Sequence, residues 1–270
     1  MSTVPGVGSV RLRPAALTLM AASAVTCLFF FASAACSDDK PSAAELSEVE
    51  DIASRTFQSS PAEADFFFAH VTDNLLKTVL FSSREDCMAN AVECIGEPSP
   101  VLEMKATAID GKKAHTTVVA PFGTFVLRLI RENGMWKVDA MEATSDDLPP
   151  GVKSVDLHLV DFAFDFKAAD IPSSGTFGFH VKNDGHQAHE VVVVKLPPGG
   201  SVEDALSQMG DDEEPAGLKL FIQPGQTVDM AFQSALAPGR YALVCSFPDV
   251  TGPGADPHFS KGMLAEFDVK

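Results

Sequence analysis

The chain has 270 residues, of which 46% are hydrophobic, and carries a formal net charge of −17 at pH 7. That length and composition favour two domains, each with enough apolar residues to build its own core. An acidic surface repels nucleic acid and anionic lipid and favours cationic partners, so nucleic-acid binding is excluded. Only two of the 20 Lys and Arg residues precede position 36, whereas all 37 Asp and Glu residues follow it.

The first residues have the pattern of a targeting segment. Two arginines precede an apolar run and a stretch of small residues, which is the order of a secretory signal peptide. A cysteine directly after small residues resembles a bacterial lipobox, which implies that Cys36 is the lipidated first residue of the mature protein. The alternative is cleavage after Ala34, which would release a soluble secreted protein. We expect a signal peptide over residues 1–35 and a lipid-anchored tether over residues 36–42, so that the protein is exported and meets the cell membrane only through its anchor.

The five cysteines fit an exported protein. Cys27 leaves with the signal peptide, Cys36 takes the lipid, and Cys245 stands alone. Cys87 and Cys94 are seven positions apart, which in a straight helix is about 10.5 Å of rise, beyond the roughly 7 Å limit for a bridge. In an oxidising compartment they suit a disulfide, provided that the residues between them form a compact turn. The alternative is a pair of buried free thiols.

Residues 43–142 combine helices with strands. Apolar residues recur at helical spacing up to about residue 81, and the capping box over residues 60–63, with proline at the first helical position, predicts a second helix start. Residues 101–141 then alternate as strands do, with Asp110-Gly111 and Asn133-Gly134 as hairpin turns of type I′. This order predicts an α+β domain in which helices pack on a curved antiparallel sheet.

The layout of that domain, with the ending NGMWKV over residues 133–138, resembles the NTF2-like superfamily across residues 43–142. Enzymes of that superfamily place acids and histidines inside the cone, and His70, Asp73 and His115 are the candidates here. Their spacing commits them to no site, so we expect a binding or spacer module.

Residues 152–270 form the second predicted domain, after a linker over residues 143–151 that ends in Pro-Pro-Gly. About seven short strands separated by Pro-Gly turns predict a Greek-key β-sandwich. The wholly apolar run over residues 191–194 predicts a strand buried on both faces. A shift of the alternation at Asp161 predicts a β-bulge, and residues 201–217 predict a helical insertion with an acidic face.

The stretch from Cys245 to Met263 gathers metal-binding side chains in one loop. It supplies a thiolate, the imidazole of His258 and a thioether, and His189 lies upstream as a fourth donor. Two histidines, one cysteine and a weakly bound methionine are the ligand set of a blue-copper electron-transfer site. Thiolate with imidazole selects copper, and a weak axial thioether favours cycling between Cu(I) and Cu(II).

Residues 153–270 resemble the cupredoxins in three places. Residues 183–190 (NDGHQAHE) are similar to the loop that delivers the first histidine ligand, and residues 238–245 (PGRYALVC) to the strand that ends in the cysteine ligand. Four residues separate the last two donors, as in plastocyanin-like and nitrite-reductase type 1 sites. The resemblance implies His189, Cys245 and His258 as equatorial ligands and Met263 as the axial one. Twelve residues separate Cys245 from His258, more than small blue-copper proteins have, so the rigidity of this loop is the open question.

Electron transfer by a mononuclear type 1 copper is the function that these features favour. Multicopper oxidases need His-x-His and His-Cys-His pairs, and a dinuclear centre needs two cysteines in the loop. The chain has neither, so no enzymatic activity is expected. The acidic surface would steer a cationic redox protein toward the site. Two alternatives stay open: a lipoprotein that stores copper or passes it between a donor and an acceptor, and a metal-free cupredoxin-like interaction module.

Overall fold

A computed structural model describes residues 40–172, 176–208, 214–232, 234–251 and 255–270. The predicted signal peptide and the predicted lipidation site Cys36 lie outside these residues. Within the described part of the chain, no helix is both long enough and apolar enough to cross a membrane. Residues 40–270 form one compact unit, and the division into two domains at residues 143–151 stays a prediction.

The described part of the chain begins with helices, as the apolar spacing predicts. Ser42 and Glu45 form a capping box at the first helix, and Ser60 and Glu63 form the predicted one at the next segment. Each box satisfies backbone N–H groups that a helix start would otherwise leave without partners. The elements are α1 (Ala43–Phe57), η1 (Pro61–Glu63), α2 (Ala64–His70), α3 (Asp73–Thr78), α4 (Arg84–Ala89) and α5 (Ala91–Ile95).

Cys87 and Cys94 form the predicted disulfide, and their Cα atoms are 5.2 Å apart. The bridge is within reach because Asn90, at φ −134° and ψ 64°, interrupts the helix between α4 and α5. The residues between the cysteines thus form the compact turn that the spacing requires.

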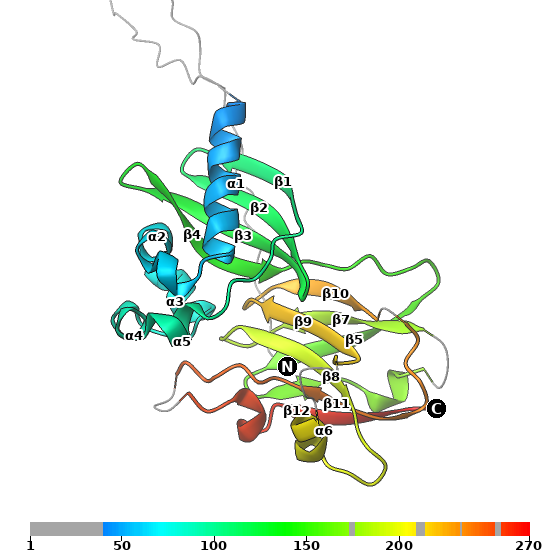
Figure 1. Ribbon diagram of the computed structural model, residues 1–270. Helices are drawn as coiled ribbons and strands as arrows, with labels where there is room; N and C mark the ends of the chain where they lie inside the picture. Colours follow the sequence, from blue (N-terminus) through cyan, green and yellow to red (C-terminus); the bar gives the residue numbers. More distant parts are fainter. Residues whose placement is uncertain (1–39, 173–175, 209–213, 233, 252–254) are drawn as a thin grey trace, which may run out of the picture. The chain divides into compact units, whose positions relative to one another are not determined.

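Four strands follow as an antiparallel meander in the order β1-β2-β3-β4. Figure 1 shows α1 lying along this sheet, and the two share a buried core that includes Trp136. Asn133 and Gly134 both have positive φ, as a type I′ turn requires. At the other hairpin the prediction is corrected: Asp110 pairs with Lys113, so the central residues are Gly111 and Lys112, and only Gly111 has positive φ, as in a type II′ turn. The strands are β1 (Glu103–Asp110), β2 (Lys113–Ala120), β3 (Gly123–Glu132) and β4 (Met135–Ala143).

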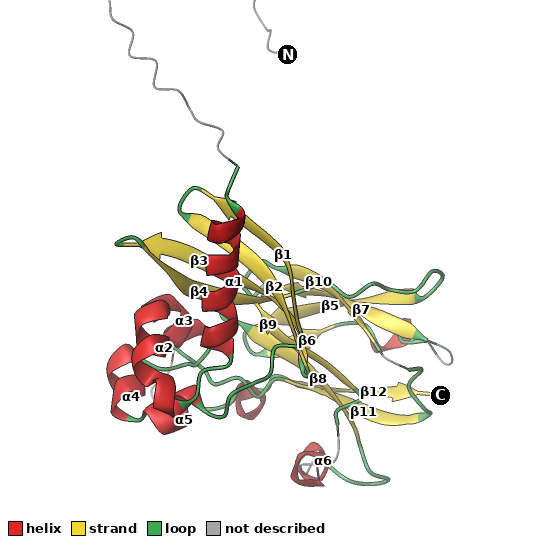
Figure 2. Ribbon diagram, turned by 45° about the horizontal axis from the view of Figure 1, so that its top comes forward, coloured by secondary structure: helices red, strands yellow, loops and turns green. Residues whose placement is uncertain are grey.

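The rest of the chain folds into the predicted β-sandwich. One sheet has the order β10-β7-β5-β6 and the other the order β12-β11-β8-β9, and Figure 2 shows both in yellow. The chain passes from one sheet to the other after β7, β9 and β10, as in β-sandwiches with Greek-key connections. The elements are β5 (Lys153–Val160), β6 (Ala163–Asp165), η2 (Ala168–Asp170), β7 (Phe177–Asn183), β8 (His189–Lys195), α6 (Val202–Gln208), β9 (Gly217–Ile222), β10 (Thr227–Ala231), β11 (Gly239–Val244), η3 (His258–Lys261) and β12 (Leu264–Val269).

Strand β8 is buried on both faces, as its apolar run predicts. Val191 and Val193 belong to the core between the two sheets. Val192 and Val194 belong to a second cluster with Val202 and Ala205 of α6, the predicted insertion helix. Because α6 covers the outer face, β8 has no solvent-facing side before Lys195.

The predicted bulge at Asp161 is wrong. Strand β5 ends at Val160, which pairs with Ala163 at the start of β6, so Asp161 and Phe162 are the two central residues of a hairpin turn. A two-residue turn shifts the alternation of apolar residues in the same way as a bulge does, because both change the phase of the side-chain period. The turn places Asp161 at the end of the sandwich where β8 begins.

Residues 144–146, inside the predicted linker, are held against the sandwich. The Asp146 carboxylate accepts hydrogen bonds from Lys219 Nζ at 2.5 Å and from the Ala231 backbone N–H at 2.9 Å. The Ser145 hydroxyl accepts from the Asp229 backbone N–H at 2.7 Å. This stretch therefore has defined partners on β9 and β10.

Candidate metal centre

Three of the four predicted donors lie together at one end of the sandwich. His189 is the first residue of β8, Cys245 directly follows β11, and His258 begins η3. Strands β8 and β11 are neighbours, paired from Val192 with Val244 onward. Because the cysteine and the first histidine sit at matching ends of paired strands, strand pairing alone brings them close.

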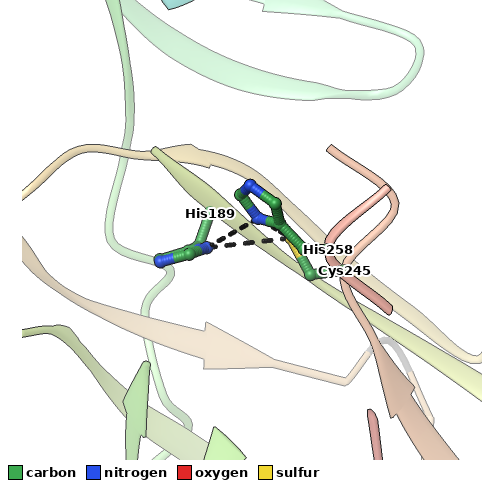
Figure 3. A group of neighbouring side chains, drawn as sticks. All are labelled: His189, Cys245 and His258. Carbon is green, nitrogen blue, oxygen red and sulfur yellow. Dashed lines mark hydrogen bonds between the residues drawn. The ribbon is translucent and has the colours of Figure 1, made fainter. Parts of the chain in front are cut away.

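The donor atoms of the three residues face one another (Figure 3). Nδ1 of His189 lies 3.1 Å from Nδ1 of His258, and Sγ of Cys245 lies 3.9 Å from the first and 3.3 Å from the second. Three donors bonded to one metal at about 2.0–2.3 Å have separations of this size. All three side chains are fully buried. Among the described His, Cys, Asp and Glu side chains, these three form a group whose spacing could hold a metal ion.

The twelve residues between Cys245 and His258 do not leave the site loose. Their two arms are joined by hydrogen bonds from Asp249 N to Asp256 O at 2.9 Å, from His258 N to Phe247 O at 2.8 Å and from the Phe259 N–H to Cys245 O at 2.8 Å. A bridge pairs Pro248 with Pro257. The two arms of the loop, which carry Cys245 and His258, are therefore fixed to each other.

Side-chain contacts around Asp249 also hold this loop in place. The buried Asp249 carboxylate accepts hydrogen bonds from Thr251 N at 2.8 Å and from Lys261. These contacts with Lys261 and Thr251 lower the pKa of Asp249 well below its usual range. The side chain of Gln187 accepts from the backbone N–H of Val250 at 2.9 Å, which ties the loop to the turn before β8.

Met263 is fully buried in the core cluster that contains Cys245. Its backbone N–H donates to His258 O at 3.0 Å, and its carbonyl accepts from Cys245 N at 3.3 Å. The main chain of Met263 is thus hydrogen-bonded to both candidate donor residues of the loop, Cys245 and His258. Its role as an axial ligand stays a proposal.

Burial keeps both histidines neutral. It lowers the pKa of His189, against the opposing effect of the nearby Asp161 carboxylate. It lowers the pKa of His258 to about 4, with the neighbouring His189 as a second cause. At neutral pH each ring therefore offers a nitrogen lone pair, the form in which imidazole binds metals.

Cys245 is held as a thiol while no metal is present. Burial raises its pKa to about 12, because a thiolate loses its hydration there. A coordinated metal deprotonates a thiol outright, so binding at this site releases a proton. The backbone N–H of Glu190 points at the sulfur from 3.5 Å, where it would stabilise the thiolate.

Glu190 is a buried carboxylate directly beside His189. It accepts hydrogen bonds from the Ser246 backbone N–H at 2.7 Å and from the Ser246 hydroxyl. Burial raises the pKa of Glu190, and the bonds from Ser246 oppose that rise. The residue after the first histidine is therefore linked to the residue after the cysteine, which couples the two ligand-bearing strand ends a second time.

Aromatic rings pack on and near the centre. The Phe162 ring lies 4.9 Å from the His258 ring, and the Phe247 ring lies 5.0 Å from Phe81, which comes from the helical part of the chain. Phe247 shares the core cluster of Cys245, whereas Phe259 packs against the outer cluster beside α6. Phe162 and Phe81 could not be assigned to the site from the sequence, because both come from segments distant along the chain.

The remaining sequence candidates are not brought together within the described residues. His70 stacks on Phe66, Asp73 pairs with Arg84, and His115 lies on β2. None of the three belongs to the donor cluster. Within the part of the chain that the structure describes, these three residues therefore belong to no group of donor side chains spaced for a metal ion.

A metal fits the donor set on two observations. Two neutral imidazoles and a thiol converge in a fully buried space, where the two Nδ1 atoms have, among the described residues, only each other and the Cys245 sulfur as hydrogen-bonding partners. The second ring nitrogen of His258, Nε2, is buried and has no hydrogen-bond partner among the described residues, a cost that a metal bond at Nδ1 would offset. Soft sulfur with two imidazoles is a donor set that suits copper.

No protein-family model and no curated protein matches the chain. Among solved structures it is similar to a sodium-dithionite-reduced auracyanin from the photosynthetic bacterium Roseiflexus castenholzii, with 23% identity, 44% of this chain and 99% of that chain covered, and a TM-score of 0.31. It is also similar to auracyanin B, with 18% identity, 47% and 94% covered, and a TM-score of 0.30. It is similar as well to Lac15 from a marine microbial metagenome, with 13% identity, 63% of this chain and 48% of that chain covered, and a TM-score of 0.22.

The sandwich of two four-stranded sheets and the buried His-Cys-His cluster confirm the resemblance to the cupredoxins over the C-terminal part of the chain. The NTF2-like assignment of residues 43–142 stays a prediction.

Proposed function

We propose that this protein is an exported, lipid-anchored electron carrier with a mononuclear type 1 copper site. His189, Cys245 and His258 would hold the copper equatorially, and Met263 would be the weak axial ligand. Copper bound there supplies a one-electron couple between Cu(I) and Cu(II). The observation that carries the proposal is the convergence of two imidazole Nδ1 atoms and one sulfur in a fully buried cluster.

Burial of the donors favours electron transfer over catalysis. A catalytic metal keeps a coordination position open to substrate or water. Here all three donor side chains have no exposed surface, so a small substrate has no route to the metal through them. The joined loop arms and the link between Glu190 and Ser246 hold the ligands in place, which suits a metal that changes oxidation state with little rearrangement.

The same burial disfavours a role in passing copper to other proteins. Delivery requires an acceptor's ligands to approach the metal while the donor's ligands leave. Donors on three joined segments would have to separate for that exchange. A carrier should instead show a reversible reduction potential and fast electron self-exchange, which a storage protein has no reason to show.

Export and anchoring rest on the amino-terminal sequence, with its basic residues, apolar run and Cys36 after small residues. The excess of acidic residues would steer encounters with a cationic redox protein. Labelling with a lipid precursor in a bacterial host tests the anchor, and a purified protein without label would refute it.

The central experiment adds Cu(II) to the metal-free protein and records its visible and electron paramagnetic resonance spectra. We expect intense charge-transfer absorption from the bond between copper and the thiolate, and its loss in Cys245→Ser. His180→Gln is the matched control, because His180 is exposed on β7 and paired with Asp229. That variant should keep the full absorption.

Thermal unfolding of each metal-free variant shows whether it is folded, so that a lost signal can be assigned to the lost ligand. A folded wild-type protein that neither turns blue nor binds copper tightly would refute the proposal. In that case the metal-free interaction module, the remaining alternative, would be favoured.

A further inference from the structure

We infer that Asp161 is a positioning residue of the metal centre: its carboxylate orients His189 and stabilises the oxidised form of the bound metal. This inference rests on the proposed copper site and adds to it a residue outside the four predicted ligands. Oδ1 of Asp161 lies 2.8 Å from Nε2 of His189, the ring nitrogen opposite the one that faces Cys245 and His258.

The contact determines which nitrogen of His189 carries the proton. An ionised carboxylate only accepts hydrogen bonds, so Nε2 must be the donor toward Asp161. Nδ1 is then left with its lone pair, directed at the other two donors. A carboxylate behind a metal-binding histidine fixes the ring and raises the basicity of the ligand nitrogen.

Asp161 is itself held in this position. Its second oxygen, Oδ2, accepts hydrogen bonds from the backbone N–H of His186 at 2.9 Å and from the His186 ring at 3.1 Å. The backbone bond ties the β5–β6 turn to the turn before β8, which carries His189. A charged group fixed by the backbone on one side can orient an imidazole on the other.

Gly185 provides the space for this contact. A Cβ atom at position 185 would lie 2.4 Å from Oδ1 of Asp161 and 2.8 Å from Nε2 of His189. Both distances are shorter than real Cβ contacts allow, so any larger residue would push the carboxylate and the ring apart. The backbone of the turn before β8 is thus shaped around the pair.

The same turn touches the second histidine as well, because Phe162, which follows Asp161, packs on the ring of His258. The β5–β6 turn therefore contacts both imidazoles of the centre, one through a charge and one through an aromatic ring. Only the charged contact distinguishes between the oxidation states of a metal. Cu(II) carries one positive charge more than Cu(I), so a nearby carboxylate stabilises Cu(II) more.

The test compares four forms of the full mature protein: wild type, Asp161→Asn, Gly185→Ala and Asp184→Asn. Asp184→Asn is the matched control, because it removes one negative charge from the neighbouring turn. The Asp184 side chain contacts His158 and Lys182, and none of the proposed copper ligands. Affinities for Cu(II) and Cu(I) are measured by competition with chelators, and the reduction potential by voltammetry.

We expect Asp161→Asn to weaken Cu(II) binding about 10–100-fold, as is typical when such a partner is removed, and to weaken Cu(I) binding less. The potential should then rise by about 59 mV for each tenfold difference between the two losses. Gly185→Ala should shift the potential in the same direction, and Asp184→Asn should leave it near the wild-type value.

Two outcomes would overturn the inference while leaving the copper site intact. One is an equal potential in Asp161→Asn and Asp184→Asn. The other is an equal loss of Cu(I) and Cu(II) affinity in Asp161→Asn, which would indicate a purely structural role. A wild-type protein that binds no copper would instead refute the proposed function itself.

A measurement on the metal-free wild type keeps the inference testable even if the variants do not fold. Nitrogen-15 NMR of the His189 ring should show the proton on Nε2. A proton on Nδ1 would contradict the assigned role of Asp161.

Discussion

The hydrogen bonds between Glu190 and Ser246 offer a quantitative test of how the centre is held together. Glu190 is buried, with an exposed fraction of 3%, whereas Ser246 is exposed. Removing the Ser246 hydroxyl should therefore destabilise the fold more than is usual for an exposed serine. The buried Glu190 carboxylate loses a hydrogen-bond donor that water replaces poorly. A hydrogen bond to a charged group contributes about 1.5–3 kcal/mol, so we expect Ser246→Ala to lower the free energy of unfolding by that amount.

The second half of the test makes the acceptor neutral. In Glu190→Gln the hydroxyl bonds to an uncharged amide, and such a bond contributes about 0.5–1.5 kcal/mol. The cost of Ser246→Ala should therefore fall by about 1 kcal/mol in the Glu190→Gln background. This difference is the coupling energy of a double-mutant cycle, within the range found for side chains in direct contact.

Urea unfolding of the metal-free protein at pH 7 measures all four corners of this cycle. An unchanged dependence on urea concentration shows that only stability has changed. Ser260→Ala is the control, since its hydroxyl donates to Pro257 O and meets no carboxylate, so its cost should be the same in both backgrounds. Equal costs for Ser246→Ala with Glu190 and with Gln at position 190 would refute the reasoning.

Two further predictions concern the disulfide and the loop. Replacing Cys87 and Cys94 by alanine together should lower stability by about 2.5 kcal/mol, from the entropy of closing so short a loop, without changing the copper absorption. Unchanged urea midpoints would contradict this. Lys261 and Thr251 hold the folded-state pKa of Asp249 below its unfolded value. The stability from Asp249 is thus fully present above the unfolded pKa of about 3.9 and is lost progressively as pH falls from there through the lower folded-state pKa. Asp249→Asn should lower the melting temperature most at pH 6 and by a smaller amount near pH 3, and an equal difference at both values would exclude this explanation.

Sequence patterns predict a helix or strand correctly where its formation depends on residues close together along the chain. The capping boxes at Ser42 and Ser60 act within four residues, so the helix starts are readable from the sequence. The apolar run over residues 191–194 shows that both faces of β8 are covered, although it does not show that α6 supplies the outer cover.

The misread turn at Asp161 shows where such patterns stop. A bulge and a two-residue hairpin change the phase of the alternation alike, so sequence alone could not separate them. The pairing of Val160 with Ala163 decides it.

The sequence by itself determined which donors the chain carries, in what order, and that they lie on the ends of strands in a sandwich. Those features depend on residue identity and on short-range periodicity. Only the tertiary structure decided that Asp161 meets His189 across 28 positions and that Glu190 reaches Ser246 across 56. These contacts depend on which strands pair and on where each turn ends, which long-range packing determines. The candidate metal donors were thus open to prediction, and the residues that contact them from elsewhere in the chain were not.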